Sequence, residues 1–384
     1  MGGREFPGAR EAALTAKRPS TITPRSRHST SPNIPDNTCD IPCPFIRVLF
    51  PLFLLIRIVL LLNRQANGPM KLRVASALMT FLCAATVACR NTAGAEGKSA
   101  AGKELPWGSG THHWVFNGRE RAFILDVPQG LKPGAPLIMV FHGFGGSAKG
   151  VRESAGFTPL SEKHGFVAVY PEGTRDSKGK PFFNVGYEFH RDQKVDDVEF
   201  ARSLAARLVR DLGLDERSVF ATGFSNGGDM SFFLGAQREP FVAAIAPVAG
   251  TMMQSLANDF RTSARISVMA VNASLDKTTL WEGDMQNRDG WGAYLGTEAV
   301  LDLWVKGLTL AQSERVDLSK TIQLKRWSTA RDETEARLYV IGVGGHDWPR
   351  NLGDERVTTA EVIWRFFDAH RPQSHQPPRR LTTE

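Results

Sequence analysis

The chain has 384 residues, of which 42% are hydrophobic and 23% are charged. This composition is that of a globular protein with a large core, and it excludes a disordered chain, a collagen and a membrane protein with many spans. The net charge of +7 comes from the first 89 residues, which hold 11 Lys and Arg against 4 Asp and Glu, whereas the rest has 36 of each. The balanced part has no excess positive charge to attract phosphate, so we expect no nucleic-acid partner.

Residues 70–95 have the layout of a bacterial secretory signal. A basic start at 70–73 precedes an apolar run at 74–88 that ends in small residues. Cys89 follows Val-Ala, as in a lipoprotein signal, and is the candidate lipidation residue. The alternative is cleavage after Ala-Gly-Ala at 93–95, which would release the protein without a lipid. We expect an extracellular or periplasmic protein, either free or lipid-anchored at the membrane surface.

The region before this signal, residues 1–69, is rich in Pro, Arg and Ser and has no helical or strand period. Its apolar stretch at 45–62 contains Arg47 and Arg57, whereas a spanning helix needs about 20 residues with few charges. We therefore expect translation to start at Met70 and residues 1–69 to be over-extended or disordered. A genuine membrane anchor is the alternative.

Every cysteine of the chain lies at or before position 89: Cys39, Cys43, Cys83 and Cys89. The remainder can therefore form no disulfide, no thiolate metal site and no cysteine nucleophile. A domain of that length can be stable without disulfides, so the cysteine pattern does not argue against export.

The rest of the chain predicts a linker at 96–110, one domain at 111–371 and a loose tail at 372–384. Apolar, β-branched runs alternate with helical patterns, which predicts an α/β domain with a mostly parallel sheet and helices on both faces. We expect strands at 111–116, 122–127, 136–141, 165–170, 217–222, 241–249, 265–271 and 337–343. We expect helices at 195–212, 226–237 and 358–370. Active sites in such sheets lie at the carboxyl ends of the strands.

Residues 223–227, GFSNG, fit the pattern G-x-S-x-G between a predicted strand and a predicted helix. That context places a serine on a sharp strand–helix turn, where residues two positions away on either side must be small. Gly223 and Gly227 meet this requirement. We predict that Ser225 is a nucleophile and that the N–H of Asn226, at the helix start, is one donor of an oxyanion hole.

The sequence HGFGG at 142–146 follows the predicted strand at 136–141. Consecutive small residues let backbone N–H groups approach a substrate oxygen, and hydrolases with G-x-S-x-G take a second oxyanion donor from this loop. We predict the N–H of Phe144 as that donor, and we expect His142 to fix the loop rather than to transfer protons. An ordinary glycine-rich turn is the alternative.

The catalytic acid should follow the serine in the chain and precede the histidine. Asp276 lies in the loop after the strand at 265–271 and is the predicted acid, with loop capping as the alternative role. Asp284 and Asp289 lie further along and are less well placed. Asp229, on the helix that follows the nucleophile, is predicted to be a surface residue.

The catalytic base should follow the last strand, and His346 does so after two glycines. A carboxylate on one ring nitrogen would fix the tautomer, so that the other nitrogen can take the serine proton. Trp281 and Trp348 flank the acid and the base, and we predict that they form aromatic walls for a flat acyl group or a sugar ring. Packing onto the core is the alternative for both.

Five motifs occur in order: HGFGGS (142–147), YPEGT (170–174), VDDVEF (195–200), GFSNGG (223–228) and GGHDWP (344–349). Together they resemble the secreted α/β-hydrolases grouped as polyhydroxybutyrate depolymerases, which are close to feruloyl and acetylxylan esterases. The resemblance runs from about residue 111 to residue 370. It implies the α/β-hydrolase fold in a single domain, a triad of Ser225, Asp276 and His346, and an oxyanion hole at Phe144 and Asn226.

The function expected from these features is a secreted serine esterase that works through an acyl-enzyme and needs no metal or organic cofactor. Its substrates would be polyesters, plant polysaccharide esters or small aryl esters, among which the fold does not choose. A serine peptidase or amidase, and a non-catalytic binding module on the cell surface, are the alternatives.

Overall fold

The computed structural model describes residues 106–260, 266–331 and 334–371. The predicted signal segment with Cys89, the linker up to residue 105 and the tail after residue 371 lie outside the described residues. Within the described ranges, no helix has the length and apolar character needed to cross a membrane.

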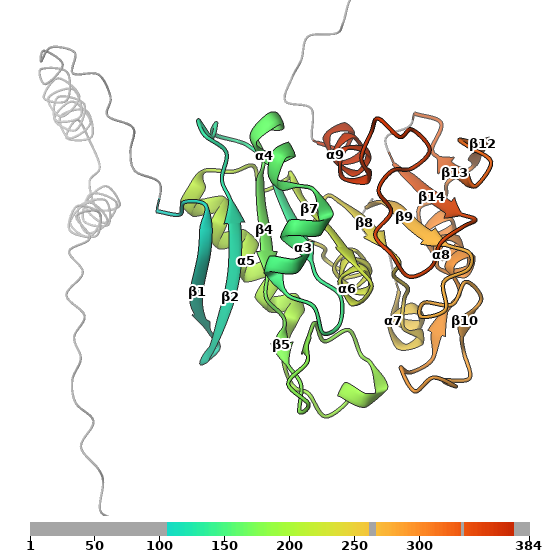
Figure 1. The fold of residues 1–384 in the computed structure, drawn as a ribbon, viewed down its shortest axis with the longest axis horizontal. Helices are drawn as coiled ribbons and strands as arrows, with labels where there is room; N and C mark the ends of the chain where they lie inside the picture. The colour runs from blue at the N-terminus through green and yellow to red at the C-terminus, as the bar shows by residue number, and fades with distance from the viewer. Residues whose placement is uncertain (1–105, 261–265, 332–333, 372–384) are drawn as a thin grey trace, which may run out of the picture. The chain divides into compact units, whose positions relative to one another are not determined.

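One ten-stranded sheet organises the described part of the chain (Figure 1). Its strand order is β1-β2-β4-β3-β7-β8-β9-β14-β13-β12. The strands from β4 to β14 in this order run parallel, and antiparallel strands extend both edges. In chain order the strands are β1 (Gly110–Phe116), β2 (Arg119–Asp126), β3 (Leu137–Phe141), β4 (Val167–Pro171), β7 (Val219–Phe224), β8 (Ala244–Val248), β9 (Ser267–Ala273), β12 (Gln312–Asp317), β13 (Ile322–Ser328) and β14 (Glu335–Ile341).

Helices cover both faces of the sheet, which confirms the predicted α/β class. One face packs against α5 (Asp197–Leu212), α6 (Asn226–Gly235) and α8 (Thr297–Gly307). The other packs against α3 (Ala148–Ala155), α4 (Thr158–His164) and α9 (Thr359–Ala369). The inner strands are apolar throughout because both of their faces are covered, and every residue of β3 and β4 is buried.

The expected elements begin and end within three residues of the observed ones. In α5, the side chain of Asp196 caps the first turn by accepting the N–H of Glu199, and Phe200, Leu204 and Leu208 form the predicted buried stripe. The helix ends at Gly213, whose φ of 68° suits a residue without a Cβ atom.

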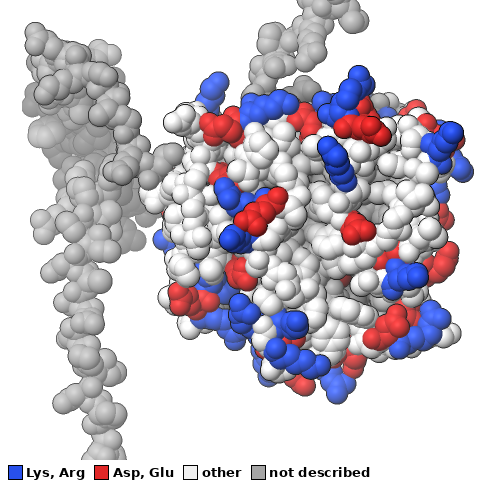
Figure 2. All heavy atoms as spheres, viewed as in Figure 1, with Lys and Arg blue, Asp and Glu red and all other residues white. Residues whose placement is uncertain are grey.

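Short elements in the loops complete the fold. Two small antiparallel ladders pair β5 (Thr174–Arg175) with β6 (Pro181–Phe182), and β10 (Gly283–Asp284) with β11 (Tyr294–Leu295). A 3₁₀ helix, η1 (Glu188–His190), lies between β6 and α5, and α7 (Gln254–Asp259) lies between β8 and β9. On the face shown in Figure 2, positive and negative side chains are interspersed, in line with the balanced charge of this part of the chain.

Candidate active site

Ser225 lies on the turn between β7 and α6, with φ 55° and ψ −120°. This conformation is strained for a residue with a side chain, and such strain concentrates at functional sites. The turn is held because the N–H of Ser225 donates to the carbonyl of Val248 at 2.9 Å, while its own carbonyl accepts the N–H of Asp229 at 2.9 Å. Ser225 therefore lies at the carboxyl end of β7, where the sequence predicted it.

The glycines on either side of Ser225 are required by close backbone contacts. A Cβ atom on Gly223 would lie 2.5 Å from the carbonyl oxygen of Gly227 and 2.7 Å from that of Phe141. A Cβ atom on Gly227 would lie 2.1 Å from the Phe141 oxygen. The steric reason for small residues at these positions is confirmed.

His346 and Asp276 form a close pair at the same edge of the sheet. Nδ1 of His346 lies 2.7 Å from Oδ2 of Asp276, whose side chain is almost fully buried. The other oxygen, Oδ1, accepts the N–H groups of Thr278 at 2.7 Å and Thr279 at 3.0 Å. These bonds fix the carboxylate, which fixes the histidine tautomer: Nδ1 donates, and Nε2 is left to accept a proton.

The histidine ring lies beside the nucleophile turn. Its centroid is 4.9 Å from that of Phe224, the residue before Ser225. Among the described residues no hydrogen bond joins Ser225 to His346, and such bonds are often long when no substrate is bound. The structure thus brings Asp276 and His346 together and places Ser225 at the same edge of the sheet, directly after the residue whose ring lies beside His346.

The predicted oxyanion loop packs against the nucleophile. A Cβ atom on Gly143 would lie 3.3 Å from the Cβ atom of Ser225. The next N–H, that of Phe144, makes no hydrogen bond among the described residues, whereas Gly145 donates to Pro181 at 2.8 Å. The N–H of Asn226 lies in the first turn of α6, where helix geometry supplies no acceptor.

His142 holds this loop, as predicted. Its Nε2 accepts the N–H of Gly173 at 2.9 Å, so the proton must sit on Nδ1, which donates to the carbonyl of Gly143 at 2.7 Å. Burial lowers the pKa of His142, which keeps the ring neutral and this tautomer in place.

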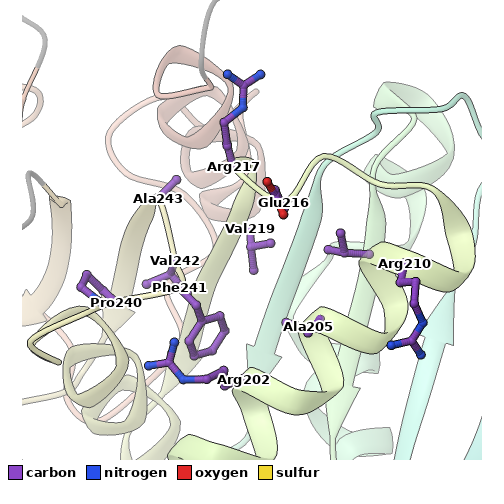
Figure 3. A pocket seen from close by; sticks show the side chains of 12 residues that line it. Arg202, Ala205, Arg210, Glu216, Arg217, Val219, Pro240, Phe241, Val242 and Ala243 are labelled. Atoms are coloured by element: carbon purple, nitrogen blue, oxygen red, sulfur yellow. The ribbon is translucent and has the colours of Figure 1, made fainter. Parts of the chain in front are cut away.

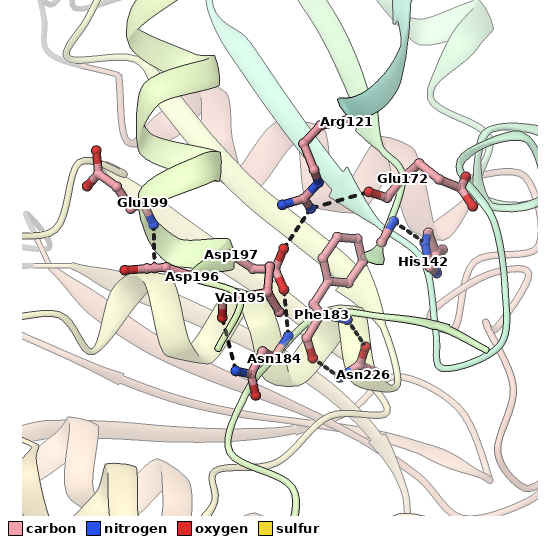
Figure 4. Close-up of polar contacts among 11 residues, drawn as sticks. Arg121, His142, Glu172, Phe183, Asn184, Val195, Asp196, Asp197, Glu199 and Asn226 are labelled. Carbon is pink, nitrogen blue, oxygen red and sulfur yellow. Dashed lines mark hydrogen bonds and ion pairs between the residues drawn. The ribbon is translucent and has the colours of Figure 1, made fainter. Parts of the chain in front are cut away.

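A network of hydrogen bonds and an ion pair holds Asn226 and the chain segments next to it (Figure 4). The side-chain amide of Asn226 accepts the N–H of Phe183 at 2.8 Å and donates to its carbonyl at 3.0 Å. Next to it, Asp197 accepts the N–H of Asn184 at 2.8 Å and pairs with Arg121 at 2.6 Å. The Asn226 side chain is therefore occupied, and only its backbone N–H is left for substrate.

Asp229 is not a surface residue, and that prediction was wrong. It is buried one turn into α6, where Oδ2 accepts the hydroxyl of Tyr187 at 2.6 Å and Oδ1 accepts the N–H of Thr251 at 2.7 Å. Burial raises its pKa to about 7. The sequence did contain a signal: α6 is apolar or small on every side, so a charged residue within it had to be buried and partnered.

Two hollows of different size open at this edge. The small hollow is lined by Tyr187, Ser225, Asp229, Thr251, Met253, Thr278, Thr279, Trp291 and Tyr294, and has a volume of about 20 Å³. The large hollow is lined by His142, Gly143, Phe144, Gly146, Ser147, Gly150, Val151, Ser154, Phe224, His346, Asp347 and Trp348, and has a volume of about 370 Å³.

The two tryptophans predicted as substrate walls have different surroundings. Trp348 lines the large hollow beside His346. Trp281 packs against the core and lines neither hollow. This is the alternative role that the sequence left open for it. The aromatic residues that line the small hollow are Tyr187, Trp291 and Tyr294, none of which was predicted from the sequence.

A third hollow, of about 700 Å³, lies at the amino ends of β7 and β8, away from Ser225 (Figure 3). Arg202 lies over the ring of Phe241 there, 5.0 Å from its centroid. Its lining includes no serine, cysteine or histidine that could act on a substrate. In the described ranges, His, Cys, Asp and Glu form no group of three or more that could hold a metal ion.

The mostly parallel sheet, the strained serine between strand and helix, and the histidine–aspartate pair at the same edge are arranged as in the α/β-hydrolase fold. The fold is that of the acetyl xylan esterase from Aspergillus awamori, which matches with a TM-score of 0.51 and 14% identity over 67% of this chain and 99% of that one. No protein-family model matches the chain.

Curated relatives of the chain carry the names of esterases and of a depolymerase. A putative esterase, NocK, of Nocardia uniformis subsp. tsuyamanensis is 31% identical over 44% of this chain and 49% of its own. Poly(3-hydroxyalkanoate) depolymerase C of Paucimonas lemoignei is 26% identical over 46% and 41%. Feruloyl esterase D of Neurospora crassa is 29% identical over 47% and 63%.

The chain thus spans between about two fifths and two thirds of the length of these relatives. Their names are those of the group that the five motifs resemble, so the resemblance of this chain to polyhydroxyalkanoate depolymerases and feruloyl and acetylxylan esterases is confirmed.

Proposed function

We propose that the protein is a serine carboxylic-ester hydrolase in which Ser225 is the nucleophile, His346 the base and Asp276 the residue that orients the base. The observation that carries the proposal is the strained Ser225 beside a histidine whose Nδ1 is bonded to a buried, fully partnered aspartate. The esterase names of the curated relatives support the same reaction.

In the first half of the reaction, Oγ of Ser225 attacks the ester carbonyl and Nε2 of His346 takes the hydroxyl proton. The carbonyl oxygen becomes an oxyanion, which the N–H groups of Phe144 and Asn226 stabilise. The intermediate then breaks its bond to the alkoxy oxygen. That oxygen takes the proton from His346, so the alcohol leaves and an acyl-serine ester remains.

In the second half, a water molecule attacks the acyl-serine while His346 takes one of its protons. The same N–H groups hold the second oxyanion. The bond to Ser225 Oγ breaks, His346 returns its proton to the serine, and the carboxylic acid leaves. Ser225, His346, Asp276 and the two N–H groups supply the nucleophile, the proton transfers and the charge stabilisation of this reaction.

We also propose that the protein is exported, with residues 70–95 as its signal. Fractionation of bacterial cells, with mass spectrometry of the mature N-terminus, tests this. A terminus at a lipid-modified Cys89 would support the anchored form, and a terminus after residue 95 the free form. An unprocessed cytoplasmic chain would contradict export.

The proposed reaction is tested with the purified full chain and with Ser225→Ala. Both are incubated with a fluorophosphonate probe, 4-nitrophenyl acetate, methyl ferulate, acetylated xylan and a hydroxybutyrate oligomer. We expect labelling and turnover for the parent chain only, because the variant lacks the attacking oxygen.

One control variant and two contrary outcomes make the test decisive. Ser231 is a buried serine in the helix after Ser225, and its hydroxyl donates to the carbonyl of Gly227. Ser231→Ala should therefore still react with the fluorophosphonate probe. A folded parent chain that takes no probe and cleaves no ester would overturn the proposal and leave the binding module as the better explanation. Cleavage of peptide amides in preference to esters would favour the peptidase.

A further inference from the structure

The two hollows at Ser225 are unequal, and their linings assign them to the two halves of an ester. His346 lines the large hollow, and in the proposed reaction it must hand its proton to the departing alkoxy oxygen. The alcohol therefore leaves on that side. The acyl group extends the other way, into the small hollow that Ser225 itself lines.

The small hollow is built by the loops that follow three neighbouring strands. Thr251 follows β8, Thr278 and Thr279 follow β9, and Asp229 lies in the helix after β7. Its open volume of about 20 Å³ is close to the roughly 10–15 Å³ that one water molecule needs. A methyl group fits in such a space, and a propyl chain does not.

We propose that the small hollow is the acyl pocket and that the Tyr187–Asp229 pair limits it to acyl groups about as short as acetyl. The inference rests on the proposed function and adds a substrate class to it: short-chain acyl esters of bulky alcohols. Asp229 and Tyr187 are specificity residues in this account, because they set the depth of the pocket and take no part in the proton transfers.

The pair is held too firmly to swing aside for a longer acyl chain. The hydroxyl of Tyr187 donates to Asp229 Oδ2 at 2.6 Å, and the carboxylate is held at its other oxygen by the N–H of Thr251. The ring of Tyr187 packs edge-on against Trp291, with centroids 5.1 Å apart. Moving either side chain would leave a buried carboxyl group without its partner, which is unfavourable.

Two of the threonine hydroxyls that line the hollow donate to carbonyl groups of neighbouring loops. Thr251 Oγ1 donates to the carbonyl of Leu295 at 2.6 Å, and Thr279 Oγ1 donates to that of Ala249 at 3.0 Å. These bonds tie the walls to the neighbouring loops. These four side chains already have partners within the protein, so we infer that they select the acyl group by its size rather than by hydrogen bonds to it.

The large hollow has the room and the walls for a bulky alcohol. Its volume of about 370 Å³ is in the range of small-molecule sites, and Phe144 and Trp348 give it aromatic surface. A sugar ring or an aryl alcohol suits such walls. The contrast between the two volumes favours an acetyl ester of a large alcohol over an ester of a large acyl group with a small alcohol.

The test is a series of 4-nitrophenyl esters with one leaving group and increasing acyl length: acetate, propionate, butyrate and hexanoate. For the full-length parent chain we expect kcat/KM to fall about tenfold or more from acetate to butyrate, since methylene groups that do not fit have effects of this size. Asp229→Ala enlarges the pocket and should raise the ratio of kcat/KM for butyrate to kcat/KM for acetate by a similar factor.

Three further variants separate pocket depth from folding. Met253→Ala enlarges the same hollow without removing the carboxyl group, so it should shift the acyl profile even if Asp229→Ala does not fold. Asp229→Asn keeps the volume and should keep the profile. Trp348→Ala, on the other side, should change discrimination between alcohols and leave the acetate-to-butyrate ratio unchanged.

Hexanoate cleaved as fast as acetate by the parent chain would overturn the inference while leaving the esterase proposal intact. So would an unchanged acyl profile in folded Asp229→Ala and Met253→Ala. No cleavage of any ester in the series, together with no fluorophosphonate label, would instead overturn the proposed function and this inference with it.

Discussion

The carbonyl oxygen of Phe141 lies so close to Gly227 that a Cβ atom added to Gly227 would be only 2.1 Å from it. Phe141 ends β3 and Gly227 is the second residue of α6, so the helix leaves the nucleophile turn directly against the neighbouring strand. This contact decides how close α6 comes to the sheet, and hence where Ser225 and the N–H of Asn226 lie. A main-chain oxygen cannot move aside as a side chain can.

Gly227→Ala should therefore damage the site more than an ordinary helix substitution. We expect a loss of stability of about 2–4 kcal/mol, comparable to other severe overpacking, and loss of fluorophosphonate labelling in whatever remains folded. Gly235→Ala in the same helix is the matched control, since its added methyl would meet side chains of Ile245 and Trp304, which can shift. Urea unfolding of both variants checks the difference, and equal losses would argue against the backbone contact as the cause.

Asp276→Asn should keep the fold and lose most of the activity. The asparagine oxygen can still accept the N–H groups of Thr278 and Thr279, but its NH₂ group would face Nδ1 of His346 and favour the wrong tautomer. For such a change in a triad we expect kcat to fall by about 10³–10⁴-fold. Steady-state kinetics on 4-nitrophenyl acetate measures it.

The matched control for that variant is Asp284→Asn. Asp284 is also buried after β9, but its carboxylate holds a turn through Arg288 and the N–H of Asp289. We expect a loss of stability with kcat nearly unchanged per folded molecule. If Asp284→Asn abolished activity and Asp276→Asn did not, the assignment of the acid would be wrong.

The sequence predicted the parts of this structure that depend on local chemistry. Buried parallel strands such as β3 are continuous apolar runs, and the turn at Ser225 needs glycine on both sides whatever surrounds it. The order of serine, acid and histidine along the chain then pointed to Asp276 and His346, which the structure pairs at 2.7 Å.

What the sequence did not predict depends on long-range packing. We expected no element between residues 272 and 337, where the structure has α8 and the antiparallel strands β12 and β13. β12 is exposed along most of its length, so it has no apolar pattern to find. The choice between Trp281 and Trp291 likewise depends on how the loop after β9 folds back, which no periodicity records.

The buried ion pair of Arg121 and Asp197 should be important for stability. Their side chains are almost completely buried and 2.6 Å apart, and Asp197 also accepts the N–H of Asn184 in the segment that Asn226 holds. Arg121→Met keeps much of the volume and leaves the carboxylate unpaired, so we expect a loss of about 3–5 kcal/mol.

Denaturant unfolding measures this loss, and an exposed ion pair provides the comparison. Lys149 and Glu153 lie one helical turn apart on α3 with most of their side chains in solvent. Lys149→Met should change the free energy of unfolding by less than about 0.5 kcal/mol. A similarly small effect for Arg121→Met would mean that solvent reaches Asp197.

Asp229 should make the stability of the protein depend on pH in the direction opposite to most aspartates. Its pKa in the folded chain is about 7, against 3.8 for an ordinary aspartate, because burial disfavours the charge. The folded state therefore binds this proton more tightly than the unfolded state. The stability that Asp229 contributes is fully present below about pH 4 and is lost as the pH rises through about 7.

Asp229→Asn removes this titration and resembles the protonated carboxyl group, since its oxygen can accept the N–H of Thr251 while its NH₂ group donates to Tyr187. The variant should therefore gain stability relative to the parent chain between about pH 4 and pH 7, by up to about 4 kcal/mol, and the gain should level off above that range. Urea unfolding at several pH values from 4.5 to 8.5 measures the difference. Hydrogen bonds and Arg288 hold the pKa of Asp284 below its usual range. Asp284→Asn should therefore change the free energy of unfolding by the same amount at every pH in this series. If Asp229→Asn also changed the free energy of unfolding by the same amount at every pH, Asp229 would be ionised throughout the series. The small hollow would then be hydrated well enough to hold a charge.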